Sequence, residues 1–299
     1  MSAAAARPAG PAGAAGPAGA AGPAEPTGPT GSIATTRWLR RIRWYLPAVL
    51  VFVGTIALWE FVVQNIDLRG LPLPAPSEIA GALSVSWGAG RWPIGKAAAA
   101  TLFEALGGLA IGTFAGVVVA GLTARFVTAR ELLLPIAIGA SAVPIIAFAP
   151  LMNNWFGVLN PLSKMMIVAV LVFFPVVVNV TRGLTSVEPA ALELMRSYAA
   201  SDWSILWRVR VPNALPYFFT ALKVGSTLAL IGAIVGEYFG GSSDVLGRVI
   251  VQSASALRFD VTWAAIVVGA VSGIVSYLAI AAVERIVIPW HASMRAGEP

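Results

Sequence analysis

Long apolar runs constrain this chain more than any other feature of its sequence. Only 11% of the 299 residues are charged and 58% are hydrophobic, whereas in soluble domains about a quarter of the residues are charged. A helix needs about 20 apolar residues to cross a bilayer. Six runs of roughly that length occur: Tyr45–Ile66, Lys96–Thr123, Leu132–Pro150, Leu162–Gly183, Ala214–Phe239 and Thr262–Val287. The sequence therefore predicts an all-α integral membrane protein with six transmembrane helices.

The distribution of basic residues predicts how these spans are oriented. A cluster of arginines, Arg37 to Arg43, directly precedes the first run and places its start in the cytoplasm. Six spans then return the C-terminus to the cytoplasm. In this arrangement thirteen of the 20 Lys and Arg residues lie inside and six outside. Lys223 lies within a span and is expected to extend toward its cytoplasmic end. We expect a multi-pass protein of the cell (plasma or inner) membrane with both termini cytoplasmic.

Composition also divides the chain into parts. Residues 1–36 consist mostly of Ala, Gly and Pro, and they lack the apolar side chains that could bury a core, so a disordered cytoplasmic tail is predicted. Residues 37–290 form the predicted transmembrane domain, and residues 291–299 form a short cytoplasmic C-terminus.

The sequence excludes several classes of chemistry. With no Cys and a single His, His291, the chain cannot supply a disulfide, an iron–sulfur site or the usual zinc ligands, so no metal site is expected. It contains no Gly-x-x-x-x-Gly-Lys-Ser/Thr phosphate loop. No cofactor is therefore expected, and no basic soluble face suggests nucleic acid.

The longest polar interruption of the apolar pattern is Glu193–Pro216. Together with the residues before it from residue 186, it is here called the 186–216 loop. A first amphipathic helix is expected to open near Ser186–Pro189, because Ser is a favourable N-cap and Pro is tolerated in a first turn. Ser201 or Asp202 is expected to cap a second short helix. Pro212 and Pro216 are expected to stop that helix before the next span.

The spacing within this loop resembles the EAA loop of ABC-importer permeases. Glu193 is followed after five residues by Ala199, where the family pattern has Gly, and then by Val209-Arg210-Val211-Pro212. Other pieces resemble nitrate/sulfonate/taurine-type permeases: Leu73-Pro74-Ala75-Pro76-Ser77, then Ala149-Pro150-Leu151 with Trp155-Phe156-Gly157, and Phe173-Phe174-Pro175 with Asn179 and Gly183.

The resemblance implies a type I ABC-importer permease fold and a non-catalytic membrane subunit. A separate cytoplasmic ATPase would bind the ATP and dock on the loop, a soluble binding protein would deliver the solute outside, and a second copy would complete a homodimer. Small side chains at residues 199–201 are expected to permit close approach of the ATPase. The residues expected to make this contact are Glu193, Arg196, Ala199, Ala200, Ser201, Asp202, Val209, Val211 and Pro212.

The resemblance also suggests a solute class, namely small anions such as sulfonates, taurine or nitrate. Related permeases carry pyrimidine vitamin precursors or riboflavin, which stay as alternatives. Glu104, Asn179 and Glu237 are polar residues of the predicted spans and are candidates for the translocation pathway, since intramembrane polar groups usually face a partner or a wet cavity.

Two other classes of function were weighed. An ion-coupled secondary transporter would favour internal repeats, which the sequence does not show, and would leave the 186–216 loop unexplained. An intramembrane enzyme would need a metal set or paired carboxylates, and neither stands at a catalytic spacing in the sequence.

Overall fold

The computed structural model describes residues 33–65, 73–88, 90–140, 144 and 147–289. The predicted tail up to residue 32 and the C-terminus from residue 290 lie outside the described residues, so their disorder stays a prediction. The chain divides into two units, residues 1–55 and residues 56–299. All the described secondary structure is helical, which agrees with the predicted all-α class.

Helix α1 (Ile33–Asn65) begins within the predicted tail, and its part from Leu46 to Asn65 is long and apolar enough to cross a membrane. In the second unit, the end of α1 contacts helix α2 (Pro76–Ser86). Glu60 there accepts hydrogen bonds from the Ser77 backbone amide at 3.0 Å and from the Ser77 hydroxyl at 2.6 Å. This glutamate is therefore held by a polar partner at the end of its span.

The core of the second unit is formed by three long helices, α3 (Ile94–Arg125), α6 (Pro161–Thr185) and α9 (Val211–Tyr238). Helix α3 lies directly on α6 through glycines spaced four residues apart, Gly108, Gly112 and Gly116. A Cβ atom built on Gly108 would lie 2.4 Å from Val168 Cβ, and one on Gly112 would lie 2.5 Å from the Ala169 carbonyl oxygen. This row of glycines is a packing surface, because only glycine allows the two backbones this close.

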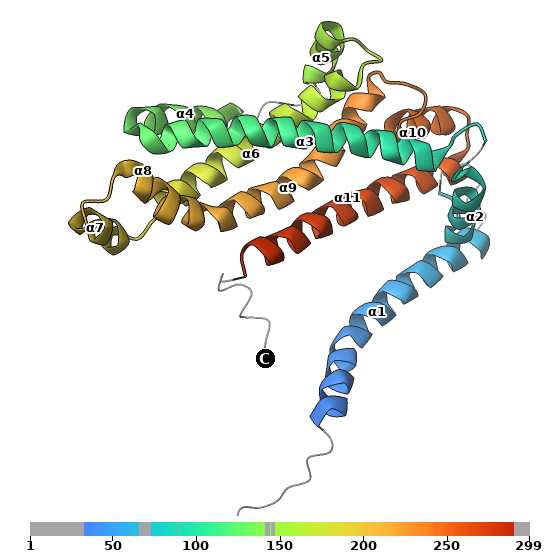
Figure 1. The fold of residues 1–299 in the computed structure, drawn as a ribbon. Helices are drawn as coiled ribbons and strands as arrows, with labels where there is room; N and C mark the ends of the chain where they lie inside the picture. Colours follow the sequence, from blue (N-terminus) through green and yellow to red (C-terminus); the bar gives the residue numbers. More distant parts are fainter. Residues whose placement is uncertain (1–32, 66–72, 89, 141–143, 145–146, 290–299) are drawn as a thin grey trace, which may run out of the picture. The chain divides into compact units, whose positions relative to one another are not determined.

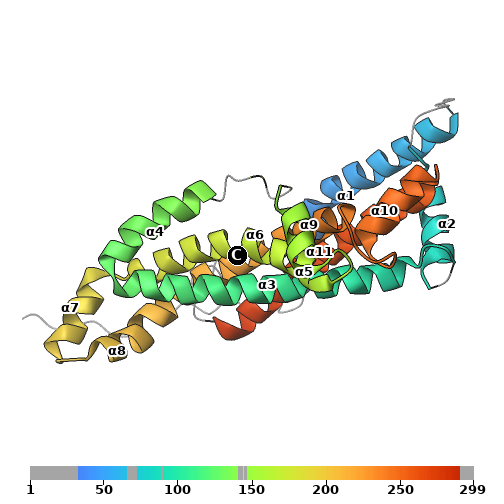
Figure 2. The same cartoon turned by 90° about the horizontal axis from the view of Figure 1, so that it is seen from above.

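The other helices are arranged around this core. Helix α11 (Phe259–Val287) packs along α9, and helix α10 (Leu246–Ser255) lies at the end of the unit that also holds α2 (Figures 1 and 2). The two short helices of the 186–216 loop, α7 (Pro189–Ser197) and α8 (Asp202–Ile205), lie at the opposite end. The long helices therefore separate the loop from α10.

The third predicted span differs from the prediction. The run from Leu132 to Pro150 is divided between helix α4 (Val127–Ala140) and helix α5 (Phe148–Phe156). With 14 and 9 residues, neither reaches the roughly 20 residues that a bilayer requires. The other five predicted spans correspond to five described helices that are long and apolar enough to cross a membrane. Hydropathy predicted the position of this apolar segment correctly. It did not predict that the segment contains two short helices instead of one long one.

Pro212 and Pro216 do not stop a helix, contrary to the prediction. The chain is helical from Asp202 to Tyr238 and passes through a π-helical turn, η2 (Leu206–Arg210), directly before α9. In that turn the Val211 amide donates to the carbonyl of Leu206, five residues back. Because a proline lacks an amide hydrogen and crowds the carbonyl four residues earlier, a local widening of the helix lets it continue through Pro212.

The contact between α3 and α6 predicts unequal effects of the same substitution at two glycines of α3. In Gly112→Ala the added methyl group meets the Ala169 backbone, and such overpacking costs about 1–3 kcal/mol. Gly121→Ala is the matched control, because nothing lies within 4 Å of a Cβ there and Ala favours helix by about 1 kcal/mol. Thermal unfolding in detergent should show a lower midpoint for Gly112→Ala and an equal or higher one for Gly121→Ala. Equal effects at both positions would contradict this packing.

Candidate functional site

The first helix of the 186–216 loop ends in a left-handed turn, a conformation that glycine usually adopts. The Ala200 amide donates to the Met195 carbonyl at 3.0 Å and the Ala199 amide to the Arg196 carbonyl at 2.9 Å, the pair of hydrogen bonds of a Schellman motif. Its left-handed position is Ala199, with a φ of +51°. Glycine is the residue that usually fills this position because a Cβ is strained there. Ala199 therefore departs from the family pattern at a cost in backbone strain.

The caps of this loop agree with the prediction in one case and not in the other. Ser201 caps α8 as predicted, since its hydroxyl accepts from the Ser204 amide at 3.3 Å. Helix α7 begins at Pro189, within the predicted range and with proline in its first turn as predicted, but Ser186 does not cap it. Ser186 is the C-cap of α6, and the N-cap of α7 is Glu188 without a side-chain hydrogen bond. The prediction missed that α6 continues to Thr185.

Two polar contacts attach the loop to the core helices. Arg210 donates to the Ala124 carbonyl at 3.2 Å, in the last turn of α3, where a cation also complements the helix dipole. Asn213 donates to the Gly183 carbonyl at 2.8 Å, near the end of α6. Asp202 lies 3.8 Å from Arg125, but both side chains are exposed, so this ion pair contributes little. The loop is therefore hydrogen-bonded to the last turns of α3 and α6.

The other residues predicted to contact the ATPase differ in their exposure to solvent. Glu193, Arg196 and Ser201 are exposed, whereas Val209, Val211 and Pro212 are half-buried. A concave pocket of about 520 Å³ opens beside them, and its lining includes Arg196 and Asp202. Sequence reasoning missed two exposed tryptophans, Trp203 and Trp207, whose rings meet edge to face 5.6 Å apart.

Two of the three pathway candidates lie together at the other end of the core. Glu104 of α3 and Glu237 of α9 are 5% and 0% exposed, and Lys164 of α6 is 0% exposed beside them. Glu237 Oε2 accepts from the Gly247 amide at 2.6 Å, whereas Glu104 Oε2 and Glu237 Oε1 are buried and have no hydrogen-bond partner among the described residues. The sequence showed no such cluster, because the two glutamates stand far apart in the chain and each lies in an apolar run.

The third candidate does not join this cluster. Asn179 is half-buried and donates to the carbonyl of Pro175 in its own helix at 2.8 Å. It stands fifteen residues beyond Lys164 on α6, roughly 22 Å along the helix axis. Lys223, expected to extend toward the cytoplasm, donates to Glu284 in the last turn of α11 at 2.7 Å. Because that turn is the predicted cytoplasmic end of α11, the contact is compatible with the expectation, which stays a prediction; the apolar pattern did not reveal the partner on another helix.

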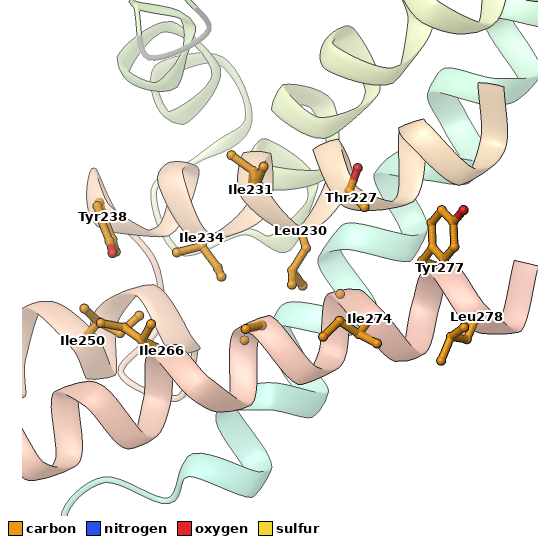
Figure 3. Close-up of a pocket in the computed structure, with 13 residues that line it drawn as sticks. Thr227, Leu230, Ile231, Ile234, Tyr238, Ile250, Ile266, Ile274, Tyr277 and Leu278 are labelled. Atoms are coloured by element: carbon orange, nitrogen blue, oxygen red, sulfur yellow. The ribbon is translucent and has the colours of Figure 1, made fainter. Parts of the chain in front are cut away.

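An apolar groove of about 500 Å³ runs between α9 and α11. Leu230 and Ile234 of α9 point toward α11, where Ile274 lines the opposite side (Figure 3). The polar side chains in its lining are Thr227, Tyr238 and Tyr277, and none of the lining residues is charged. The groove suits a lipid chain or another apolar surface and offers nothing that would orient a small anion.

Comparison with known proteins decides the family. Residues 108–289, well over half of the chain, match the family of binding-protein-dependent transport system inner membrane components. The chain belongs to this family. It is thus a permease subunit of the ABC-transporter type, with the type I permease fold. Its multi-pass membrane character follows from the family and from the five apolar helices.

Permeases named for different solutes are similar to this chain to nearly the same degree. The formylaminopyrimidine transport permease of Halalkalibacterium halodurans is 30% identical, over 82% of this chain and 96% of its own length. The riboflavin transport system permease of Chloroflexus aurantiacus is 28% identical, over 86% and 95%. The taurine transport system permease of Escherichia coli is 28% identical, over 86% and 96%. Their similarity extends through nearly the whole length of each relative.

The left-handed turn of this permease predicts opposite effects of glycine at two adjacent positions. Ala199→Gly removes a strain of about 1–2 kcal/mol, more than the 0.4–1 kcal/mol that glycine costs through the unfolded chain. Trypsin cleavage after the exposed Arg196 should therefore slow. Ala200→Gly is the control, since Ala200 has no positive φ. In this variant, trypsin cleavage after Arg196 should be as fast as in the unmodified chain or faster. Faster cleavage of Ala199→Gly than of the unmodified chain would contradict the assigned turn.

Proposed function

We propose that this permease is the membrane subunit of an ATP-driven importer and that a separate cytoplasmic ATPase docks on the 186–216 loop. The ATPase supplies the ATP chemistry, because the chain carries no phosphate loop of its own. The observation that carries the proposal is the combination of family membership with a loop that exposes side chains yet is hydrogen-bonded to the ends of two core helices. A partner bound there has a direct mechanical connection to α3 and α6.

The chemistry of the loop surface supports a protein partner. Trp203 and Trp207 are 68% and 54% exposed and Tyr198 is 77% exposed, and aromatic residues are enriched where proteins bind one another. The concave pocket beside Arg196 and Asp202 provides a recess of about 520 Å³ with charges of both signs. Exposed aromatic side chains around a charged recess fit the hot-spot pattern of protein interfaces.

The proposal also includes a soluble binding protein, a second copy of the chain and the orientation of the termini. A soluble binding protein delivers the solute on the extracytoplasmic side, two copies of the chain form a homodimer, and both termini are cytoplasmic. Family membership supports the binding protein, since the family is defined by dependence on one. The bias of Lys and Arg toward the predicted inner side supports the orientation.

For the solute we propose a small anion of the sulfonate, taurine or nitrate class. The taurine relative and the nitrate import permease of Leptolyngbya laminosa, 22% identical over 68% of this chain, support this class. The relatives for riboflavin and formylaminopyrimidine support the alternative, a vitamin or its pyrimidine precursor. Uptake of labelled taurine, nitrate, riboflavin and formylaminopyrimidine by cells with and without the gene separates the two classes. Co-purification of an ATPase separates the importer from an ion-coupled secondary transporter.

The docking proposal predicts that Ala199→Glu uncouples the transporter. The substitution adds a charge that must be desolvated against the partner, and an uncompensated buried charge costs about 3–5 kcal/mol. Since each ~1.4 kcal/mol is a factor of ten, ATPase binding should weaken by two orders of magnitude or more. Membranes should then contain normal amounts of permease, little bound ATPase and no solute-stimulated ATP hydrolysis.

The control for this experiment is Ala199→Gly, which restores the family residue and should retain ATPase binding and transport. The exposed Glu131→Gln tests whether any change of charge has the same effect. Retained ATPase binding and transport in Ala199→Glu would show that this part of the loop is not the docking surface.

The proposed orientation predicts where inserted tags become accessible. Tags at Glu188 and after Pro299 should be cytoplasmic, whereas a tag at Ser243, between α9 and α10, should be extracytoplasmic. Protease protection of the tags in sealed, oriented membranes measures this directly. A tag at Ser243 on the same side as the other two would overturn the orientation.

A further inference from the structure

Three arginines from three separate elements line the concave pocket beside the 186–216 loop, here called the arginine pocket. Arg125 is the last residue of α3, Arg196 lies in the last turn of α7, and Arg210 is the last residue of the π-helical turn η2. The described lining contains one acidic residue, Asp202. Three positive charges therefore stand against one negative charge, and the pocket favours an anion.

The acidic residue does not occupy the arginines. Asp202 Oδ2 lies 3.8 Å from Arg125 and both side chains are exposed, so this pair is weak. Arg210 donates to the neutral carbonyl of Ala124 at 3.2 Å, and a guanidinium has five N–H donors in a planar fork. Such forks suit the oxygens of a phosphate group. An anion with several oxygens can therefore bond all three elements at once.

The rest of the pocket is largely apolar, which a free inorganic anion would not use. Trp203 in this lining is exposed, and tryptophan is favoured at the level of the lipid headgroups. The apolar members of the lining are Gly121, Ala124, Leu192, Trp203, Ile205 and Leu206. A ligand that combines a charged group with an apolar part fits this lining best.

The apolar wall continues along α3 as an exposed stripe of Phe114, Val118 and Gly121, here called the α3 stripe. These residues precede Arg125 by eleven, seven and four positions, so all four lie on one face of the helix. Phe114 and Val118 are exposed, and among the described residues nothing lies within 4 Å of a Cβ built on Gly121. One face of α3 thus presents an open apolar track that ends in a guanidinium.

The length of α3 matches this track to the depth of a lipid. The helix has 32 residues and is therefore about 48 Å long, whereas the hydrocarbon core of a bilayer is about 30 Å thick. Its last turn, with Arg125, reaches the headgroups. Phe114 lies roughly 16 Å further back along the axis, at the depth of the acyl chains. Basic pockets at the ends of membrane helices are a setting in which anionic lipid headgroups bind.

We propose that the arginine pocket binds an anionic phospholipid, whose phosphate is held by the three arginines and whose acyl chain lies along the α3 stripe. The bound lipid connects the end of α3 to α7 and η2 and holds the 186–216 loop at the membrane surface. Tyr198 and Trp207 do not line the pocket, so they stay accessible to a protein partner. This inference rests on the pocket and on the membrane helix, and does not depend on the docking of an ATPase.

Binding of phosphatidylglycerol to the purified full-length permease, measured by native mass spectrometry, tests the site. It should bind more tightly than phosphatidylcholine, which has no net charge. Arg196→Gln should weaken phosphatidylglycerol binding about fivefold, because one basic residue near an anionic lipid contributes about 1 kcal/mol. Adding Arg125→Gln should bring the loss to about 25-fold. Arg208→Gln is the matched control, since exposed Arg208 lies in the same turn η2 and does not line the pocket.

A second variant tests the acyl chain without changing any charge. Gly121→Leu fills the open track where no described residue is in the way, and should weaken phosphatidylglycerol binding severalfold. Gly139→Leu is its control, because this exposed glycine of α4 also has nothing within 4 Å among the described residues and does not line the pocket. Inorganic phosphate, which has the charge but no acyl chain, should not displace the lipid. Unchanged thermal unfolding of each variant in detergent shows that its fold is intact.

The contrary results are distinct. Equal binding of the two lipids, or phosphatidylglycerol binding that the double arginine variant leaves unchanged, would overturn the proposal. Displacement by inorganic phosphate together with normal lipid binding by Gly121→Leu would overturn it as well, because the pocket would then take a free anion. A double arginine variant that binds the lipid normally but loses a bound ATPase would assign the arginines to an acidic segment of that partner instead. Because lipid binding is measured on the permease alone, its failure is separate from a failure of ATPase docking.

Discussion

The close contact between α3 and α6 is the constraint on which the rest of this structure depends. In a bilayer the hydrophobic effect does not drive helices together, so association rests on packing and on polar contacts. Gly108 and Gly112 allow the α3 backbone to lie against Val168 and Ala169. This contact aligns the two helices along their length. It brings the 186–216 loop to one end and the Glu104–Glu237 pair to the other.

The two ends use the aligned helices in different ways. At one end, Arg210 and Asn213 attach an exposed loop to the last turns of α3 and α6, where the proposed ATPase would act on the core. At the other end, buried polar groups of α3 and α9 cap the first turn of α10. Both arrangements follow the same rule, because the backbone groups at helix ends need partners that the helix itself does not provide.

The sequence was sufficient for the helical class and for five of the spans, since each depends on local composition. It was not sufficient where the outcome depends on local backbone geometry or on partners distant in the chain. The break between α4 and α5 lies within a continuous apolar run, and the π-helical turn before Pro212 depends on local backbone geometry. The clustering of Glu104 with Glu237 appears only when α3 and α9 are packed together. The strain at Ala199 could have been found from the glycine missing in the family pattern.

The central claim is that the 186–216 loop is the surface through which this permease is driven by an ATPase. Because the chain contains no cysteine, a single Ser197→Cys substitution gives one defined attachment point on α7, and Ser84→Cys on α2 gives a control on the opposite end. Both positions are exposed. Cross-linking with a short bifunctional reagent in membranes active in transport should join Ser197→Cys, and not Ser84→Cys, to a separate ATPase chain. A Ser197→Cys permease that transports its solute but forms no such product, or equal products at both positions, would contradict the account.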